Sequence, residues 1–475
     1  MSLYRRVITF DLSRRGLGGL ALLSLAGCGG VPSPGSGIAL PDRFSAAPPA
    51  PANWPDAAWW QGFGSPELDA LMQAALGGNF DVRAAEARVR QADAQLRVTG
   101  QRLLPTGNLT ANTQRTQTPT QTATAANIGG RSRYIQREFF QTQLQASWEV
   151  DFWGRNRRAV EAAERTASAA RFEVGAVLLT TQASVANTYF NVLAAREQLA
   201  IQEANLASAQ RILALLRQRL AVGTADGLDV AQQQTLVEQQ RAAVPPLRQS
   251  AEQNTYSLGT LTGMVPENVP LPRQQLGDIR IPTPSPGLPV EVLVRRPDLW
   301  QAEASLASAQ ANIESARAAL LPTIQLTTTG GFQNILLENL LRPGSALYSL
   351  AAGLTQPIFQ LGQLRAQLRL TEAQAEELLE LYRQSIVAAL VDVENAIVAL
   401  RETGEQETLQ LAQLRSAERA YAISDTQLRA GTIDLITVLN TQSSVFTARN
   451  ALAQIRLARL QAAVGLFRAL GGGWA

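Results

Sequence analysis

The side chains that most often perform catalysis are nearly absent from this chain. Its 475 residues contain no histidine, and since no lysine occurs either, all 42 basic residues are arginine. General bases and zinc ligands are commonly histidine, whereas phosphate-binding loops and Schiff bases require lysine. The single cysteine cannot form an intrachain disulfide or a cysteine–histidine metal site. We therefore expect no enzyme, no catalytic residue, no metal and no soluble cofactor. The charged side chains that remain are arginines and carboxylates, and they are joined by one thiol.

The thiol belongs to Cys28, which follows a short apolar segment. Arginines precede Leu17–Ala26, and Leu25-Ala26-Gly27 leads directly into the cysteine. The segment is too short for a transmembrane helix of about 20 residues and is typical of a signal peptide, with the export route (Sec or twin-arginine) left open. Leu-Ala-Gly-Cys resembles the bacterial lipoprotein box, which implies cleavage after residue 27 and a diacylglycerol and an N-acyl chain on Cys28. Gly29, and not aspartate, follows the cysteine, which resembles lipoproteins that are sorted to the outer membrane.

The net charge of +3 does not indicate a nucleic-acid partner. Residues 1–27 contain four arginines and one aspartate, and the other 38 arginines balance 38 carboxylates. No arginine-rich stripe with interleaved aromatic residues stands out, as a nucleic-acid surface would require. We therefore expect no nucleic acid to bind.

A Gly-Thr-x-Asp motif occurs twice, each time after a long predicted helix. Glycine suits the positive φ that often follows a helix, and aspartate can cap the next helix. Other residues repeat at similar offsets, which indicates an internal two-fold sequence repeat. The motif residues are Gly223, Thr224 and Asp226 in the first copy and Gly431, Thr432 and Asp434 in the second, 208 positions later.

The helices before these motifs are predicted from a seven-residue period. Large side chains recur every seventh residue from Leu178 to Leu220, and a related series runs from Ile386 to Leu428. This period keeps one side of a helix against a partner and favours a left-handed coiled coil. Residues 155–222 contain no proline and would extend about 100 Å as one helix. Pro245-Pro246 is expected to break or kink the first returning helix.

A strand is predicted over residues 140–152, where apolar and polar side chains alternate. The length suits a membrane-spanning β-strand, which needs about 9–11 residues. Further strands are expected near Leu103–Gln114, Pro322–Phe332 and Leu347–Phe359, with polar loops at Arg115–Arg137 and Gln333–Ala346. Membrane barrels have at least about eight strands and no open edges, so several copies must assemble. The pattern alone leaves their number open.

Several segments together resemble one protein family. The chain is similar to the outer membrane factors, the TolC/OprM-like channels, and most closely to their NodT-type lipoprotein subgroup. The resemblance implies a mainly α-helical fold with membrane β-structure. Long coiled-coil hairpins would form a trimeric α-barrel beneath a twelve-stranded outer-membrane β-barrel, with four strands per chain. The matching segments are Ser147–Arg155, Arg295–Leu299 with Ala302-Glu303, Ala319–Pro322, Gln356–Phe359 with Gly362, and both Gly-Thr turns.

The function implied by this resemblance is the exit duct of a tripartite efflux pump of the RND type. Such a duct is lipid-anchored in the bacterial outer membrane, extends into the periplasm, and carries small molecules such as drugs or toxic compounds. The implied partners are two further copies of the chain, a periplasmic adaptor (membrane fusion) protein, an inner-membrane RND transporter and outer membrane lipid. The glycines and threonines of both turns would dock the adaptor, although they could equally serve only to make the turns.

The resemblance also implies a periplasmic aperture controlled by charge. Relatives have an aperture-lining aspartate at the position of Asp229, whereas an ordinary acid at a helix start is the alternative. The corresponding position in the second half is Thr437, which suggests a less acidic aperture. Arg219 and Arg429 flank the turns, and we expect them to pair with acids on neighbouring helices. The aperture candidates are Asp229, Arg429, Asp226 and Asp434.

The predicted organisation follows from these features. Residues 1–27 form the signal peptide, 28–53 the lipid-anchored linker, 54–265 the first repeat, 266–290 the inter-repeat linker and 291–470 the second repeat. A type I protein-secretion channel is the alternative function within the same fold. A coiled-coil envelope strut is a third, but a strut does not explain the alternating strand.

Overall fold

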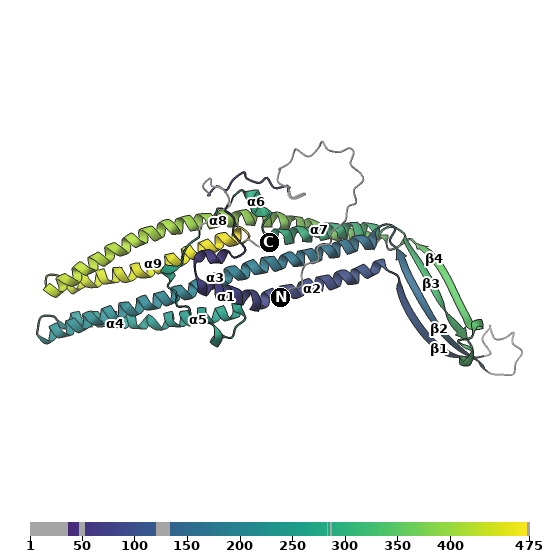
Figure 1. Ribbon diagram of the computed structural model, residues 1–475, viewed down its shortest axis with the longest axis horizontal. Helices are drawn as coiled ribbons and strands as arrows, with labels where there is room; N and C mark the ends of the chain where they lie inside the picture. Colours follow the sequence, from purple (N-terminus) through teal and green to yellow (C-terminus); the bar gives the residue numbers. More distant parts are fainter. Residues whose placement is uncertain (1–36, 47–52, 120–133, 283, 286, 473–475) are drawn as a thin grey trace, which may run out of the picture. The chain divides into compact units, whose positions relative to one another are not determined.

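The computed structural model describes residues 37–46, 53–119, 134–282, 284–285 and 287–472 (Figure 1). The chain divides into two units, Met1–Gly37 and Ile38–Ala475, and every element below belongs to the second. The predicted signal peptide, Cys28 and part of the linker after it lie outside the described residues. None of the helices described is both long enough and apolar enough to cross a membrane.

Helices account for most of the described chain, and two of them are unusually long. The α-helices are α1 (Pro66–Gly78), α2 (Phe80–Gly100), α3 (Arg155–Ala221), α4 (Gly227–Ala242), α5 (Val244–Thr262), α6 (Pro289–Leu293), α7 (Pro297–Ala318), α8 (Leu361–Ala430) and α9 (Leu435–Ala469). Short 3-10 helices are η1 (Trp59–Phe63), η2 (Gln101–Leu103), η3 (Pro266–Asn268), η4 (Leu276–Asp278), η5 (Leu337–Asn339) and η6 (Pro343–Ser345). α3 has 67 residues and α8 has 70, so each extends about 100 Å. The helix predicted over residues 155–222 is therefore confirmed.

Four antiparallel strands form one sheet in the order β1-β2-β3-β4 (Figure 1). The two central strands pair with neighbours on both sides, whereas β1 and β4 each have a single neighbour in the described chain. The sheet therefore has two open edges. The strands are β1 (Thr106–Pro119), β2 (Tyr134–Val150), β3 (Thr323–Asn334) and β4 (Ala346–Thr355).

The strand positions are confirmed, but several predicted boundaries are wrong. Part of the predicted loop Arg115–Arg137 belongs to β1 and β2, where Arg115 pairs with Glu138 across the ladder. The polarity of this segment suggested a loop, but threonine favours strands when it is paired. The last predicted strand ends at Thr355 and not at Phe359, because Pro357 has no N–H to give to a ladder.

The two faces of the sheet differ in chemistry. In β2 one face presents glutamine and serine side chains, and the register places them beside Thr and Gln residues of β3. Neighbouring polar groups bond each other, as in Gln325 Nε2 to Ser147 Oγ at 2.5 Å. The opposite face is apolar and open to its surroundings: 91% of Tyr348, 80% of Leu350 and 75% of Leu109 are exposed. Within the part of the chain that the structure describes, no globular core covers this face.

The turn between the sheet and α3 is held by Asp151. Its two carboxylate oxygens accept hydrogen bonds from the backbone N–H groups of Asn156 (2.9 Å) and Arg157 (2.8 Å). Such donors have no partner inside the helix. Gly154, with φ of 82°, takes the left-handed conformation that glycine adopts without strain. Trp153 donates from Nε1 to the carbonyl of Pro322 (2.7 Å), which joins this turn to the residue before β3.

We call α3 with α4 and α5 the first hairpin, and α8 with α9 the second hairpin. The predicted break at Pro245 and Pro246 in the first hairpin is confirmed, because α4 and α5 are separate helices. Gln202 of α3 donates from Nε2 to the carbonyl of Gln240 at 2.9 Å. This carbonyl lies in the last turn of α4, where carbonyls lack intrahelical donors.

The second hairpin contains the same contact without a break. Gln410 of α8 donates from Nε2 to the carbonyl of Ala448 in α9, at 3.3 Å. Both residues lie 208 positions after their counterparts Gln202 and Gln240. Ala448 is in the interior of α9, and a carbonyl oxygen has two lone pairs, so it accepts this bond in addition to its helical one. One glutamine position thus ties the long helix to the returning helix in both hairpins.

Aromatic side chains of η1, α3 and α9 belong to the largest buried cluster among the described residues. Trp59 stacks on Phe467 with ring centroids 5.0 Å apart, and the rings of Phe63 and Phe190 lie 5.1 Å apart. All four side chains are buried. Aromatic residues remove large apolar areas from water, so this cluster is a main source of stability.

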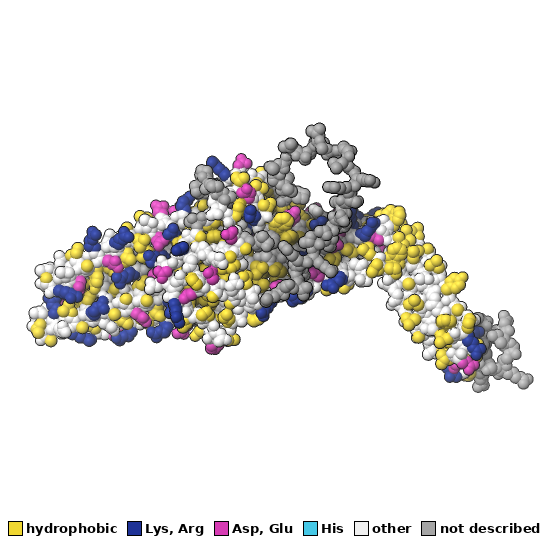
Figure 2. All heavy atoms as spheres, in the orientation of Figure 1, with side chains coloured by type: hydrophobic (Ala, Val, Ile, Leu, Met, Phe, Trp, Pro, Cys, Tyr) yellow, Lys and Arg dark blue, Asp and Glu magenta, His cyan; other side chains and the backbone are white. Residues whose placement is uncertain are grey.

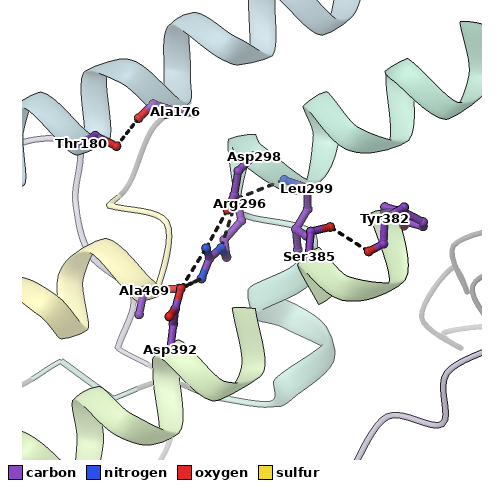
Figure 3. Close-up of polar contacts among 9 residues, drawn as sticks. All are labelled: Ala176, Thr180, Arg296, Asp298, Leu299, Tyr382, Ser385, Asp392 and Ala469. Carbon is purple, nitrogen blue, oxygen red and sulfur yellow. Dashed lines mark hydrogen bonds and ion pairs between the residues drawn. The ribbon is translucent and has the colours of Figure 1, made fainter. Parts of the chain in front are cut away.

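Arg296 joins three helices near the end of α9 (Figure 3). Its guanidinium donates to Asp298 at the start of α7 (2.6 Å), to Asp392 of α8 (3.3 Å) and to the carbonyl of Ala469 (3.4 Å). Only 11% of the Arg296 side chain is exposed. Burial acts to lower the pKa of Arg296, but hydrogen bonds and charge from Asp298 and Asp392 raise it overall. The Arg-Arg-Pro-Asp segment therefore fixes α7 against α8 and α9.

Candidate functional site

The tips of the two hairpins, residues 222–226 and 431–434, have the same backbone geometry. Gly223 and Gly431 both have φ of 73°, as predicted for a glycine after a helix. Thr224 donates to the carbonyl of Arg219 from its backbone N–H (2.8 Å) and from Oγ1 (3.1 Å). Thr432 makes the same pair of bonds to the carbonyl five residues before it, at 3.0 and 3.2 Å. Each threonine thus closes its turn.

The aspartates of both motifs cap the returning helices. Asp226 accepts from the backbone N–H of Asp229 (2.9 Å), and Asp434 accepts from that of Thr437 (2.8 Å). The pKa of Asp434 is lowered because the side chain and the backbone of Thr437 hydrogen-bond its charged form. The stability that this cap adds is therefore present at neutral pH and is lost as the pH falls through the lowered pKa. In one chain, these two aperture candidates are engaged at helix starts.

The arginines beside the tips have partners other than those expected. Arg219 of the first hairpin donates from Nη1 to the carbonyl of Leu428 in the second hairpin, at 3.0 Å. Arg429 pairs with Asp425 one turn earlier on its own helix, at 3.1 Å. Within the described residues of one chain, neither arginine contacts an acid of a neighbouring helix, and pairing with acids of another copy stays a prediction. The carbonyl of Leu428 already accepts the backbone N–H of Gly431 at 3.0 Å, and its second lone pair accepts the guanidinium of Arg219 at the negative end of the helix dipole.

Asp229 lies in the first turn of α4, and its carboxylate makes no hydrogen bond within the described residues. Beside it, 63% of Leu228 is exposed, and 57% of Ile436 is exposed at the equivalent position 208 residues later. Sequence reasoning missed this pair of exposed aliphatic side chains, although the repeat offset would have identified them. Each tip therefore combines a tight turn, an acidic cap and one exposed aliphatic residue.

Exposed aromatic and aliphatic side chains gather where the strands meet the helices, and Figure 2 shows a concentration of hydrophobic groups there. Exposed fractions are 64% for Phe152, 46% for Trp153 and 69% for Ile358, and Phe359 is fully exposed. Aromatic residues of membrane proteins are enriched at the membrane–water interface. The sheet, with its apolar outer face and this aromatic rim, has the features of a membrane-embedded surface.

No group of His, Cys, Asp and Glu side chains among the described residues is arranged to hold a metal ion. The buried hydroxyl of Tyr189 instead contacts Ser65 (2.9 Å) and Glu67 (3.0 Å), and burial raises its pKa. These groups join α1 to α3. The hydrogen bonds of Tyr189 therefore stabilise packing. At the hairpin tips, the only chemistry is electrostatic.

Comparisons with known proteins agree with this geometry. The family described as outer membrane efflux protein matches residues 71–264 and 288–472. The pyoverdine export outer membrane protein OpmQ of Pseudomonas aeruginosa is 40% identical over 457 residues, covering 96% of this chain and 96% of that protein. The outer-membrane channel OprN has a TM-score of 0.85 at 26% identity, with 92% and 97% coverage. The open state of the Neisseria gonorrhoeae channel MtrE has a TM-score of 0.81 at 27% identity, with 91% and 96% coverage. The chain therefore belongs to the outer membrane efflux protein family and is an outer membrane efflux channel, not an enzyme.

Proposed function

We propose that the chain is the exit duct of a tripartite efflux pump of the RND type. Three copies form a twelve-stranded barrel in the outer membrane and a helical tunnel in the periplasm. A periplasmic adaptor docks on the tips, an inner-membrane RND transporter supplies cargo, and lipid on Cys28 anchors each chain. Small-molecule cargo is supported by relatives named for pyoverdine export and toluene efflux.

The observation that carries this proposal is the open four-stranded sheet. Its edge strands β1 and β4 each have one neighbour, and unpaired edges are not tolerated in lipid. Membrane barrels have at least about eight strands, so the four strands of one chain are too few, and two copies would just reach eight. Three copies give twelve, as the family resemblance implies. The exposed apolar face, with Tyr348 and Leu350, then faces lipid.

The tips support adaptor docking and a charged aperture. Gly223 and Gly431 expose a tight turn, and exposed Leu228 and Ile436 offer apolar contact next to it. Asp229, with a carboxylate that bonds nothing among the described residues, is available to face the tunnel axis. Three copies would place three such carboxylates around one aperture, which favours cations.

Negative-stain electron microscopy of the purified mature protein in detergent tests the assembly. We expect hollow particles with three-fold symmetry that combine a barrel with a tunnel of about 100 Å. Intact monomers or solid rods would refute the duct. Particles of another closed symmetry would keep the duct and reject the trimer.

Planar-bilayer recordings test the tip. Asp229→Asn removes one negative charge per chain, and we expect the preference for cations over anions to fall roughly twofold.

Arg219→Gln weakens the contact between the two hairpins, so we expect a larger or more frequently open conductance. Arg217→Gln is the control, because Arg217 binds Gln234 within its own hairpin at 2.8 Å. Unchanged selectivity and conductance in both test variants would mean that the tip is not the constriction.

A further inference from the structure

Three buried amide side chains meet within about one turn of α3, well before the tip of the first hairpin. Asn205 of α3, Gln233 of α4 and Gln442 of α9 have no exposed surface. Gln233 donates from Nε2 to the carbonyl of Ala209 (2.8 Å), and Gln442 donates from Nε2 to Ser208 Oγ (3.1 Å). We call Asn205, Gln233 and Gln442 the amide cluster. Because Gln442 belongs to the second hairpin, the amide cluster lies where the two hairpins meet.

Most polar atoms of the amide cluster are unpaired. Nδ2 and Oδ1 of Asn205, and Oε1 of both glutamines, have no hydrogen-bond partner within the described residues. Buried polar groups are normally paired, because an unpaired one keeps the full cost of leaving water. The packing of the two hairpins is therefore less favourable at this level than an apolar layer of the same shape would be.

The amide cluster interrupts an apolar seam between the hairpins. Ile212 and Leu216 follow Asn205 at intervals of seven and eleven residues, so the three side chains lie on one face of α3. Toward the tips, Ile212 and Leu216 pack with Leu428 and Val438 of the second hairpin. Toward the sheet, the largest buried cluster joins α3 to α9 again. Two apolar contacts thus enclose a level at which the hairpins pack through unpaired polar groups.

Separation of the hairpins would change the balance between these contacts. An amide that reaches water regains the hydrogen bonds that it lost on burial, whereas Ile212 and Leu216 lose apolar burial in the same movement. The bond from Arg219 to the carbonyl of Leu428, at 3.0 Å, also opposes separation. The closed arrangement is therefore stabilised close to the tips and destabilised at the amide cluster.

We propose that the amide cluster biases the two hairpins toward separation, so that the contacts at the tips decide whether the aperture opens. Asn205 contributes most, since both polar atoms of its side chain are unpaired. Small changes at the tips can then shift the population between closed and open states. This inference rests on the proposed duct and gives a conformational role to residues about 25 Å along α3 from the turn at Gly223.

Asn205→Leu tests the proposal, because leucine has the same branching as asparagine and carries no polar group. We expect the ratio of open to closed time in planar bilayers to fall about fivefold or more. Asn205→Ala removes the same two unpaired atoms without adding volume, so it should lower the ratio as well. The fall is most easily measured in combination with Arg219→Gln, in which openings are expected to be more frequent.

Gln202→Ala is the matched control for Asn205→Ala. Gln202 lies about one turn before Asn205 and is only 5% exposed, but its Nε2 donates to the carbonyl and to Oε1 of Gln240, at 2.9 and 2.7 Å. Its loss should therefore lower the apparent melting temperature of the detergent-solubilised protein clearly more than Asn205→Ala does.

Two results would overturn the proposal and leave the duct in place. One is an unchanged or higher ratio of open to closed time in both Asn205 variants of a conducting protein. The other is a loss of melting temperature in Asn205→Ala as large as that in Gln202→Ala. A wild-type protein that forms no pore would refute the duct itself, and this inference with it.

Discussion

Replacing Gly331 with valine is expected to prevent the sheet from forming. A Cβ at this position would lie 2.2 Å from the carbonyl oxygen of Thr142 and 2.6 Å from Gln143 Cα, both in the backbone of the neighbouring strand. Backbone atoms of a paired strand cannot move aside as a flexible side chain can. Overpacking typically costs about 1–3 kcal/mol, and here the β2–β3 ladder itself must separate. We expect no assembled channel in the outer membrane.

The measurement is recovery of the oligomer from outer-membrane fractions, followed by channel activity in bilayers. Gly330 is a closely matched control, because a Cβ there meets nothing within 4 Å. Gly330→Val should therefore assemble at close to the normal level, since valine also favours strands. Equal recovery of the two variants would show that β2 and β3 are not in close contact at Gly331.

The second large effect is expected from Arg296→Met. Methionine keeps much of the apolar volume but removes the charge that Asp298 and Asp392 share, and it leaves the carbonyl of Ala469 without this donor. Both aspartates are partly exposed, at 42% and 43% of their side chains, so water will compensate some of the loss. We expect destabilisation of about 2 kcal/mol, below the roughly 3–5 kcal/mol for breaking a fully buried ion pair.

The apparent melting temperature of the detergent-solubilised protein measures this effect. Arg295→Gln is the control. Arg295 is exposed, and its guanidinium carbon lies 4.5 Å from the centroid of the Trp54 ring. This cation–π contact is expected to contribute only about 0.5–1 kcal/mol. The decisive result is which of the two variants has the lower apparent melting temperature. A larger loss in Arg295→Gln than in Arg296→Met would contradict the role of Arg296 as the link between α7, α8 and α9.

The regular parts of this fold could be predicted from the sequence because they depend on periodicity. The seven-residue series before Leu220 and Leu428 predicted both long helices, and the alternation after Phe140 predicted β2. These patterns are local, and each repeats over many residues. The break at Pro245 was equally predictable, since proline removes a backbone donor wherever it stands.

The strand ends were not predictable in the same way. The Thr- and Gln-rich segments that flank residues 120–133 lack a clear apolar face, so nothing local distinguishes strand from loop. Their pairing, as between Arg115 and Glu138, becomes visible only when the register of the whole ladder is known. That register is set by residues farther along β1 and β2.

The site was only partly predictable for a related reason. The glycines and threonines of the tips act within a single turn, and their roles follow from local geometry. Arg219 bonds a carbonyl that lies 209 positions away in sequence, and such an acceptor has no residue type to mark it. Arg196 likewise bonds the carbonyl of Pro272, 76 positions away, and no periodicity indicates that the two segments meet.

The glutamine contacts of the two hairpins bear on where such a chain can change direction. Gln410 bonds the carbonyl of Ala448 although α9 is continuous, and Gln202 bonds the equivalent carbonyl of Gln240 where the helix is broken. Pro245 and Pro246 remove the backbone donors for the carbonyls of residues 241 and 242, whereas Gln202 holds the carbonyl just before them. The glutamine thus anchors the last regular turn ahead of the break, so the chain can change direction there while α4 stays tied to α3.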